Sequence, residues 1–313
     1  MTVVSSAVVT VATRSHFHRG SCLLESVNRY LPEADLYVVL ADRDDGQLRA
    51  QPFEVIPVET LRIPNVAGFV HRYGPAELSF ATKPWALDEM FRRGYDRVIY
   101  LDADIVVYSS LRPMVAMLDS ASILLTPHLS QVPGDVASAS EIVILLAGAY
   151  NSGFVGLARS PAALAFVDWW GQKLLHDCRV DIDRGYVGDQ RWLDLVPGMF
   201  DGVRVVRHPG WNVARWNMRE RPLTSANGRI HAGGEPLVFF HFSGLLSELE
   251  STGQQSNPDV AALAPDVWVL VEDFAKALER HGAQDYARLP FAFAHSPARA
   301  RAEIAYRVKA PAR

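Results

Sequence analysis

Two carboxylates interrupt an apolar, β-branched run at residues 98–107, which reads VIYLDADIVV. Such a run predicts a buried strand of a parallel sheet, and side chains two positions apart on a strand share a face. Asp102 and Asp104 are therefore expected to project together. Two like charges in an apolar setting are costly unless a cation neutralises them. The pair predicts a divalent metal at the carboxyl end of a central strand. The alternative is a strand end at which one aspartate bonds backbone amides.

The surrounding pattern predicts an α/β fold with a Rossmann-like, mostly parallel central sheet. We expect strands at residues 7–12, 36–40, 53–58, 122–126, 148–157 and 237–242, and helices at 21–30, 84–93, 162–175, 190–195 and 260–280. The first helix is expected to follow a polar loop over residues 13–20. Pro84 suits the first turn of its helix, and Gly94 is expected to stop it.

Composition is that of a globular protein and limits its partners. The chain has 313 residues, of which 49% are hydrophobic and 21% charged, with a net charge of -4. No global basic field indicates nucleic acid as a partner. Cys22 and Cys178 match no metal-binding spacing, so a reducing, cytoplasmic setting is expected. The apolar residues 5–12 are too short to span a bilayer and predict a strand rather than a signal peptide.

We expect the chain to divide into a main domain over residues 1–250 and a helical, basic C-terminal extension over residues 251–313. Basic residues outnumber acids over residues 288–313. A solvated helical tail is the favoured interpretation. The alternatives are a peripheral contact with anionic lipid, at the inner face of a membrane, or a basic acceptor-binding lip. The sequence leaves a homo-oligomer open.

Five short motifs occur in a set order: TK at residues 82–83, LDAD at 101–104, NSG at 151–153, GDQ at 188–190 and HFSG at 241–244. With these motifs the chain resembles the retaining glycosyltransferases of family 8, which include glycogenin and bacterial lipopolysaccharide galactosyl- and glucosyltransferases. The likeness spans about residues 7–244. It implies a single domain of the GT-A type and a UDP-sugar donor.

The resemblance implies that Asp102, Asp104 and His241 bind a metal ion. Two carboxylates and an imidazole suit Mn²⁺ and tolerate Mg²⁺. The metal would neutralise the donor diphosphate and stabilise the departing nucleoside diphosphate. For His241 alone, a packed strand-end histidine is the alternative.

The resemblance also implies a set of donor-binding and catalytic residues. Lys83 is expected near the sugar or diphosphate as a positive clamp, with an ordinary helix-start lysine as the alternative. Asn151 and Asp189 are expected to hold donor-sugar hydroxyls. Gln190 lies where the family places a side chain beneath the anomeric carbon, and stabilising an oxocarbenium-like centre is the safer role for its amide. Asp189 is also a candidate helix N-cap.

Further residues complete the implied donor site. The first strand–helix junction is expected to meet the uracil and ribose, and Asp42 is a weaker candidate there, since it also suits a plain turn. The additional donor-binding residues are Ala12, Thr13, Arg14, Asp42, Ala103, Ser152 and Gly244.

One departure from the family pattern concerns charge. After the HFSG motif the family usually carries a lysine that grips the diphosphate, whereas residues 245–249 read LLSEL. Lys83, Arg14 or Arg215 must compensate, or donor binding is weaker. Trp211 and Trp216 are equally well interpreted as an acceptor platform or as core residues.

The resemblance therefore predicts a metal-dependent, retaining glycosyltransferase that moves a hexose from a UDP-sugar to a carbohydrate or lipid-linked acceptor. A degenerate, non-catalytic nucleotide-sugar-binding protein is the alternative. A sugar-phosphate nucleotidyltransferase is less favoured, because that class needs a glycine-rich loop after the first strand and residues 12–16 read ATRSH.

Overall fold

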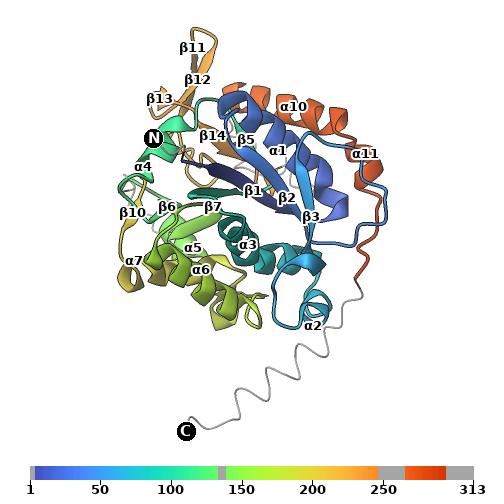
Figure 1. Ribbon diagram of the computed structural model, residues 1–313. Coiled ribbons are helices and arrows are strands. Elements are labelled where there is room, and N and C mark those ends of the chain that lie inside the picture. Colours follow the sequence, from blue (N-terminus) through green and yellow to red (C-terminus); the bar gives the residue numbers. More distant parts are fainter. Residues whose placement is uncertain (1–3, 133–138, 246–264, 294–313) are drawn as a thin grey trace.

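Seven strands form the central sheet, in the order β10-β6-β7-β4-β1-β2-β3 (Figure 1). The computed structural model describes residues 4–132, 139–245 and 265–293. Neighbouring strands run parallel except at β7, which is antiparallel to both β4 and β6. The predicted mixed, mostly parallel α/β fold is confirmed. The strands are β1 Ser6–Ala12, β2 Asp35–Leu40, β3 Glu54–Pro57, β4 Arg97–Leu101, β6 Ile123–Pro127, β7 Tyr150–Ala158 and β10 Val203–Val205.

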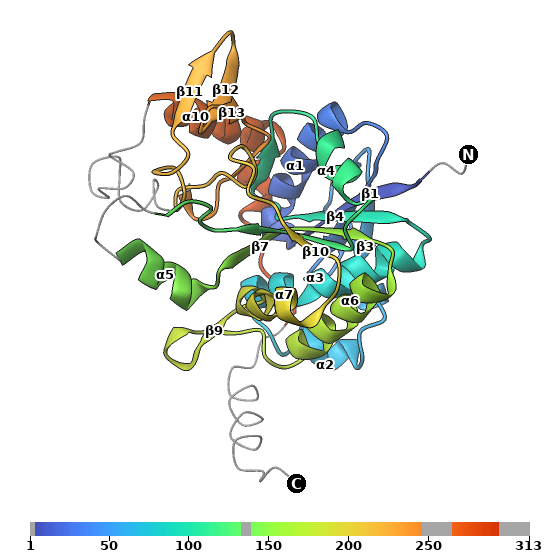
Figure 2. The same ribbon diagram turned by 90° about the vertical axis from the view of Figure 1, so that its left-hand side faces the viewer.

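Helices cover both faces of this sheet (Figures 1 and 2). Along β1, Val8 joins one hydrophobic cluster together with residues of α1 (Phe17–Tyr30). Val9 joins a second cluster, which includes residues of α3 (Pro75–Arg92) and α6 (Pro161–Leu174). Alternate side chains thus enter opposite layers, which explains why the strand is apolar throughout.

Smaller elements surround the three layers. The remaining helices are η1 Arg14–His16, η2 Val58–Thr60, α2 Val66–Val70, α4 Arg112–Met117, α5 Ala139–Ala147, η3 Ile182–Arg184, η4 Gln190–Leu195, α7 Val196–Met199, α10 Pro265–Arg280 and α11 Ala283–Tyr286. The remaining strands are β5 Ile105–Val107, β8 Val180–Asp181, β9 Tyr186–Val187, β11 Leu223–Ala226, β12 Arg229–Ala232, β13 Glu235–Pro236 and β14 Phe239–His241. β5 pairs with β14, β8 with β9, and β11 to β13 form an antiparallel sheet.

Two predicted helix starts are wrong. α1 begins at Phe17 rather than at residue 21, because His18 and Ser21 are buried and their polarity does not mark a loop. α3 begins at Pro75, which takes the first-turn position, so Pro84 lies inside the helix. The predicted stop is confirmed: Gly94 follows α3 with a φ of 101°.

The run at residues 98–107 is not one strand, contrary to the prediction. β4 ends at Leu101, and the Ile105 amide donates a hydrogen bond to the Asp102 carbonyl across a turn. β5 then leaves the central sheet and pairs with β14. Asp102 and Asp104 therefore come together through a turn, not through strand alternation.

The C-terminal extension packs on the sheet domain in its described part. α10 lies against α1 (Figure 1), and Phe274 of α10 stacks on Phe242 with ring centroids 4.2 Å apart. The predicted helix at residues 260–280 is confirmed over its described part. The predicted division at residue 250 and most of the basic tail lie outside the described residues. Within the described ranges, no helix has the length and apolarity to cross a bilayer.

Candidate functional site

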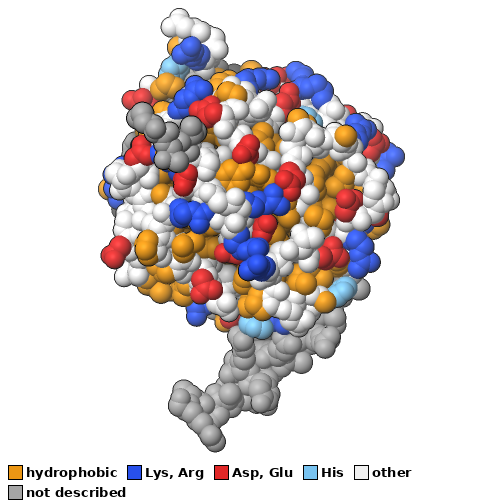
Figure 3. Space-filling view, viewed as in Figure 1, with side chains coloured by type: hydrophobic (Ala, Val, Ile, Leu, Met, Phe, Trp, Pro, Cys, Tyr) orange, Lys and Arg blue, Asp and Glu red, His pale blue; other side chains and the backbone are white. Residues whose placement is uncertain are grey.

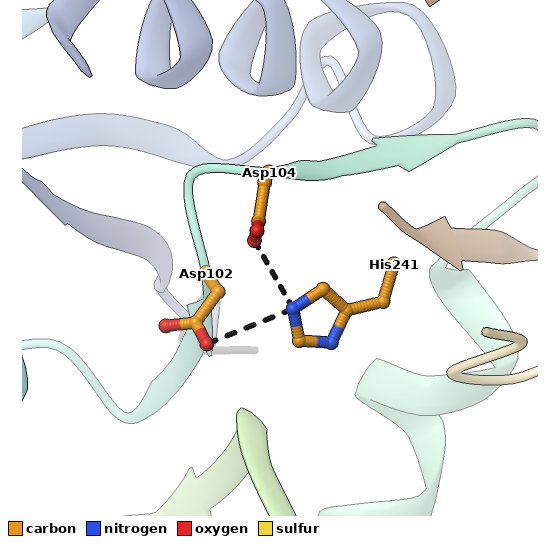
Figure 4. A group of neighbouring side chains, drawn as sticks. All are labelled: Asp102, Asp104 and His241. Atoms are coloured by element: carbon orange, nitrogen blue, oxygen red, sulfur yellow. Dashed lines mark ion pairs between the residues drawn. The ribbon is translucent and has the colours of Figure 1, made fainter. Parts of the chain in front are cut away.

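The turn between β4 and β5 carries two aspartates toward the end of β14. Asp102 and Asp104 lie in this turn, and His241 is the last residue of β14 (Figure 4). The Nε2 atom of His241 lies 3.0 Å from Oδ1 of Asp104 and 3.9 Å from Oδ2 of Asp102. One ligand atom from each residue lies within 4.8 Å of the others. The predicted ligands therefore form a cluster that can hold a metal ion.

Backbone hydrogen bonds fix this cluster from three directions. The Asp102 amide donates to the Gly153 carbonyl of β7 over 2.8 Å, and the Phe242 amide donates to the Asp104 carbonyl over 2.9 Å. The His241 amide donates to the Val213 carbonyl over 2.8 Å. Segments far apart in the sequence thus set the positions of all three side chains.

Gly153 makes room for the imidazole of His241. A Cβ atom at residue 153 would lie 2.4 Å from Cε1 and 2.8 Å from Nδ1 of His241, and 2.7 Å from Oδ1 of Asn151. A side chain at this position would therefore displace the ring. This close contact explains why the third residue of the NSG motif is a glycine.

The cluster is electrostatically suited to a cation. Burial raises the pKa of Asp104, but the charges of His241 and Arg19 lower it to about 2. Oδ1 of Asp102 is engaged by the Tyr100 hydroxyl, which donates over 2.7 Å, and by Lys83. Oδ2 of Asp102 is the oxygen that faces His241. Carboxylate oxygens and an imidazole nitrogen are suitable ligands for Mn²⁺ and tolerable ones for Mg²⁺.

Lys83 is buried between two carboxylates. Its side chain is on α3, is 1% exposed, and places Nζ 2.9 Å from Oδ1 of Asp102 and 2.9 Å from Oδ2 of Asp189. Nζ also donates to the carbonyl and hydroxyl oxygens of Ser152, each over 3.3 Å. Burial opposes the charge on Lys83, but the two carboxylates more than offset it and raise its pKa. The lysine thus joins the cluster of Asp102, Asp104 and His241 to the GDQ motif.

Asp189 occupies the N-cap position of η4 without capping it through its side chain. Burial raises the pKa of its carboxyl group, and the charge of Lys83 opposes that rise. The indole of Trp170 donates to the Asp189 carbonyl over 3.1 Å. Oδ2 of the carboxylate is therefore engaged by Lys83, and the backbone carbonyl by Trp170.

Gln190 is held in one orientation by three hydrogen bonds. Its Oε1 accepts from Nδ2 of Asn151 over 3.0 Å and from the Ser152 amide over 3.3 Å. Its Nε2 donates to the Ala147 carbonyl at the end of α5 over 2.9 Å. These contacts fix which end of the amide faces β7.

Asn151 connects Gln190 to a buried polar layer that the sequence does not reveal. Its Nδ2 also donates to Nε2 of His128 over 3.3 Å, and its Oδ1 accepts from the Gly153 amide and from Nδ2 of Asn212, each over 3.0 Å. Burial lowers the pKa of His128 to about 4, so its imidazole is neutral and can accept. Asn212 has a φ of 51° and is fully buried. That unusual backbone is visible only in the structure.

Two predicted aromatic residues have different environments. Trp211 is buried against Phe154 and Phe239 and belongs to the core. Trp216 is half-buried, and its ring meets the ring of His241 edge-on at a centroid distance of 5.4 Å. Of the two, only Trp216 therefore borders the cluster.

The first strand–helix junction is held by its own set of contacts. Ala12 ends β1, and Thr13 bonds Ser15 through its hydroxyl. The guanidinium of Arg14 pairs with Asp45, lies 3.4 Å from Asp42 and donates to the Pro290 carbonyl over 2.5 Å.

Both carboxylate oxygens of Asp42 are engaged within the protein. Oδ1 accepts from the amides of Arg43 and Ala292, each over 2.9 Å, and Oδ2 faces Arg14. The structure thus joins this junction to the C-terminal residues Pro290 and Ala292. Thr13 also bonds His16, whose imidazole interacts electrostatically with Asp104. The other two predicted donor-binding residues lie in turns at the cluster: Ala103 lies between the two aspartates, and Gly244 follows β14 with a φ of 69°.

Curated relatives match at low identity, and no protein-family model matches the chain. The chain is 25% identical over 248 residues to the uncharacterized protein YfnF of Bacillus subtilis (strain 168), covering 77% of this chain and 82% of YfnF. It is 28% identical over 259 residues to the uncharacterized protein YfnD of the same strain, covering 77% of this chain and 79% of YfnD.

Solved structures of glycosyltransferases resemble the fold. The glycosyltransferase GlyE of Streptococcus pneumoniae TIGR4 matches with a TM-score of 0.50 and 15% identity, covering 92% of this chain and 65% of GlyE. The galactosyltransferase LgtC matches with a TM-score of 0.46 and 16% identity, covering 88% of this chain and 95% of LgtC. With the mixed, mostly parallel sheet, the likeness to GlyE identifies a glycosyltransferase fold of the GT-A type.

Replacing Gly153 by alanine should weaken metal binding, because the added Cβ would displace the His241 ring. We expect the affinity for Mn²⁺, measured by calorimetry, to fall by roughly tenfold or more. Gly198→Ala is the matched control, since a Cβ at that position meets no atom within 4 Å. Equal Mn²⁺ affinity in the Gly153 variant and the wild-type protein would contradict the assigned cluster.

Replacing Lys83 by methionine should destabilise the protein, because it leaves Asp102 and Asp189 without their shared cation. Removing one partner of a buried ion pair costs roughly 3–5 kcal/mol of unfolding free energy. Denaturant unfolding of the metal-free protein measures this loss. Lys173→Met, on the half-exposed part of α6, should change stability by less than about 1 kcal/mol. Similar losses of unfolding free energy in both variants would show that the Lys83 bridge contributes no more to stability than a partly exposed lysine.

Proposed function

We propose that this protein is a metal-dependent, retaining glycosyltransferase of family 8 that moves a hexose from a UDP-sugar to a carbohydrate or lipid-linked acceptor. One juxtaposition carries the proposal, on a glycosyltransferase fold. Lys83 bridges Asp102, a member of the cluster with Asp104 and His241, to Asp189, which directly precedes Gln190. A donor diphosphate bound at the cluster would therefore lie near Gln190.

Asp102, Asp104 and His241 would hold Mn²⁺, or Mg²⁺ in its place. When bound, the metal supplies Lewis-acid stabilisation of the nucleoside diphosphate leaving group. Lys83 keeps Oδ1 of Asp102 engaged and so directs Oδ2 toward the ligand position.

Gln190 would act on the anomeric centre by electrostatics. Its Oε1 already accepts two hydrogen bonds, which use its lone pairs and weaken it further as a nucleophile. A fixed amide dipole still stabilises positive charge that develops in an oxocarbenium-like transition state. Asn151 makes its hydrogen bonds within the protein, so we assign it to positioning Gln190 rather than to binding a sugar hydroxyl.

Arg19 would supply the cation that the family lysine provides elsewhere. Lys83 and Arg14 are already paired with carboxylates. Arg19 lies in the first turn of α1, its positive charge lowers the pKa of Asp104, and its Nε is buried without a hydrogen-bond partner among the described residues. A guanidinium in this position suits a phosphate oxygen.

Calorimetric binding of UDP and GDP, each with Mn²⁺ and with chelator, tests the proposal. We expect UDP to bind in preference to GDP and only with Mn²⁺. Asp104→Ala should lower the Mn²⁺-dependent UDP affinity more than about tenfold. Gln190→Ala should keep UDP affinity and slow donor hydrolysis or transfer by roughly 10²–10³.

Other outcomes point elsewhere. Tight, metal-dependent UDP binding without hydrolysis of any UDP-sugar would favour a non-catalytic binding protein. Absence of binding to either nucleotide would refute the donor assignment. An equal loss of UDP affinity and turnover in Gln190→Ala would make this residue a binding residue.

Arg19→Gln should weaken UDP binding by roughly tenfold and leave uridine binding unchanged, because a charged hydrogen bond to phosphate is worth about 1.5–3 kcal/mol. Arg29→Gln, farther along α1 and 68% exposed, is the matched control. If Arg19→Gln binds UDP as the wild-type protein does, Arg19 does not replace the lysine that the family carries after the HFSG motif, and another group does so.

A further inference from the structure

The residues that follow α11 connect the two helical layers of the sheet domain. Leu289 packs against the hydrophobic cluster that contains residues of α1, whereas Phe291 and Phe293 pack against the cluster that contains residues of α3 and α6. Figure 1 shows this segment leaving α11 and running toward α2. We call residues 289–293 the C-terminal strap.

Two backbone hydrogen bonds tie the C-terminal strap to the ends of β1 and β2. The Ala292 amide donates to Oδ1 of Asp42, which lies just after β2, over 2.9 Å. The Pro290 carbonyl accepts from the guanidinium of Arg14, which lies just after β1, over 2.5 Å. The strap thus reaches the edge of the sheet at which these parallel strands end.

Asp42 and Arg14 in turn hold the backbone between β1 and α1. Oδ2 of Asp42 accepts from the Arg14 amide over 3.4 Å and lies 3.4 Å from its Nε. Asp42 is 1% exposed and Arg14 is 4% exposed, so neither side chain reaches a ligand in this arrangement. Both are therefore positioning residues, and they act through the turn that follows β1.

The turn that follows β1 lies at the switch point of the sheet. β1 has β2 on one side and β4 on the other, and an open α/β sheet binds its ligand in the crevice between two such strands. Thr13 and Ser15 hold Nδ1 of His16 over 3.1 and 3.0 Å. His16 is exposed and interacts electrostatically with Asp104. The turn therefore presents a fixed, accessible group beside the metal-binding aspartate.

The strand order places this turn where the nucleoside of a donor would lie. β4, which ends at the turn carrying the two aspartates, lies between β7 and β1. Gln190, at which we place the donor sugar, accepts hydrogen bonds from Asn151 and Ser152 of β7. In a UDP-sugar the diphosphate separates the sugar from the nucleoside. With the diphosphate at the cluster and the sugar toward β7, the nucleoside extends toward β1 and β2.

The approach to the C-terminal strap carries balanced charge. Arg49 forms an ion pair with Asp285, and its amide donates to the Tyr286 hydroxyl over 2.9 Å. Figure 3 shows acidic and basic side chains interspersed along this right-hand edge of the molecule. Exposed ion pairs of this kind contribute little to stability. Loosening the strap would therefore change the geometry of the turn after β1 rather than the electrostatic field around the site.

We propose that the C-terminal strap positions the turn that receives the donor nucleoside, so that docking of the strap and binding of UDP favour each other. The proposal rests on the proposed function, because it needs a UDP donor at the cluster. The contacts form one chain: the strap amide fixes Asp42, and Asp42 fixes the backbone of Arg14. Coupling between two sites is reciprocal, so each direction can be measured.

Hydrogen–deuterium exchange of the full chain tests the first direction. With Mn²⁺ present, UDP should slow exchange over residues 289–293 by roughly fivefold or more, the lower end of typical coupling between sites. The Ala292 amide is the reporter, because it is bonded to Asp42. Pyrophosphate with Mn²⁺ brings the diphosphate without a nucleoside, so it should leave this exchange unchanged.

Substitution at residue 292 tests the second direction. Ala292→Pro removes the amide that bonds Asp42. We expect it to weaken Mn²⁺-dependent UDP binding by roughly fivefold or more, with unchanged affinity for Mn²⁺ and for pyrophosphate with Mn²⁺. Ala292→Gly keeps the amide and should bind UDP more tightly than Ala292→Pro. A strap with a purely structural role would affect UDP and pyrophosphate alike.

Four results in a protein that binds UDP would overturn the coupling and leave the proposed function standing. Exchange of the strap could be unchanged by UDP, or slowed equally by UDP and pyrophosphate. Ala292→Pro could bind UDP as tightly as the wild-type protein, or lose UDP and pyrophosphate affinity equally. Absence of UDP binding by the wild-type protein would instead refute the proposed function, and the coupling with it.

Discussion

The buried ammonium of Lys83 is the interaction on which the candidate site depends. It lies 2.9 Å from a carboxylate oxygen of Asp102 and 2.9 Å from one of Asp189, so a single charge connects α3, the turn after β4 and the start of η4. Three charges removed from water stabilise a structure only when all are present and well placed. This condition fixes where the GDQ motif lies against the turn after β4.

The bridge also divides Asp102 into two functional halves. Oδ1 is committed to Lys83 and Tyr100, and Oδ2 is left facing His241. Because the carboxylate cannot rotate without losing the bridge, the ligand position is set before any metal binds. Gly153 completes this arrangement by leaving space for the imidazole. Preorganisation of this kind is what a metal site needs to hold its ligands within a few tenths of an ångström.

The sequence predicts the inner strands of the central sheet well, because they are buried on both faces and their β-branched runs are local signals. It misses the edge strand β10, which is short and only partly buried. It identifies Asp102 and Asp104 for a reason that proves wrong: alternation along one strand. The true cause is the pairing of β5 with β14, some 130 residues later, which breaks the run after Leu101. Asp42 and Ala292 meet for the same kind of non-local reason. His128 and Asn212 carry no local signal at all, since their role follows from contacts with Asn151.

The site has a charged half and a neutral half, and the difference explains their separate tasks. Asp102 and Asp189 face the ammonium of Lys83, and Asp104 faces His241. This half of the site is rich in carboxylates, which favours a divalent cation there. On the other side, Asn151, Asn212, His128 and Gln190 form a layer of neutral amides and imidazole. A neutral layer can fix the Gln190 dipole without adding a charge that would compete with the donor diphosphate for the metal. Ser152 joins the halves, because its amide donates to Gln190 and its oxygens accept from Lys83.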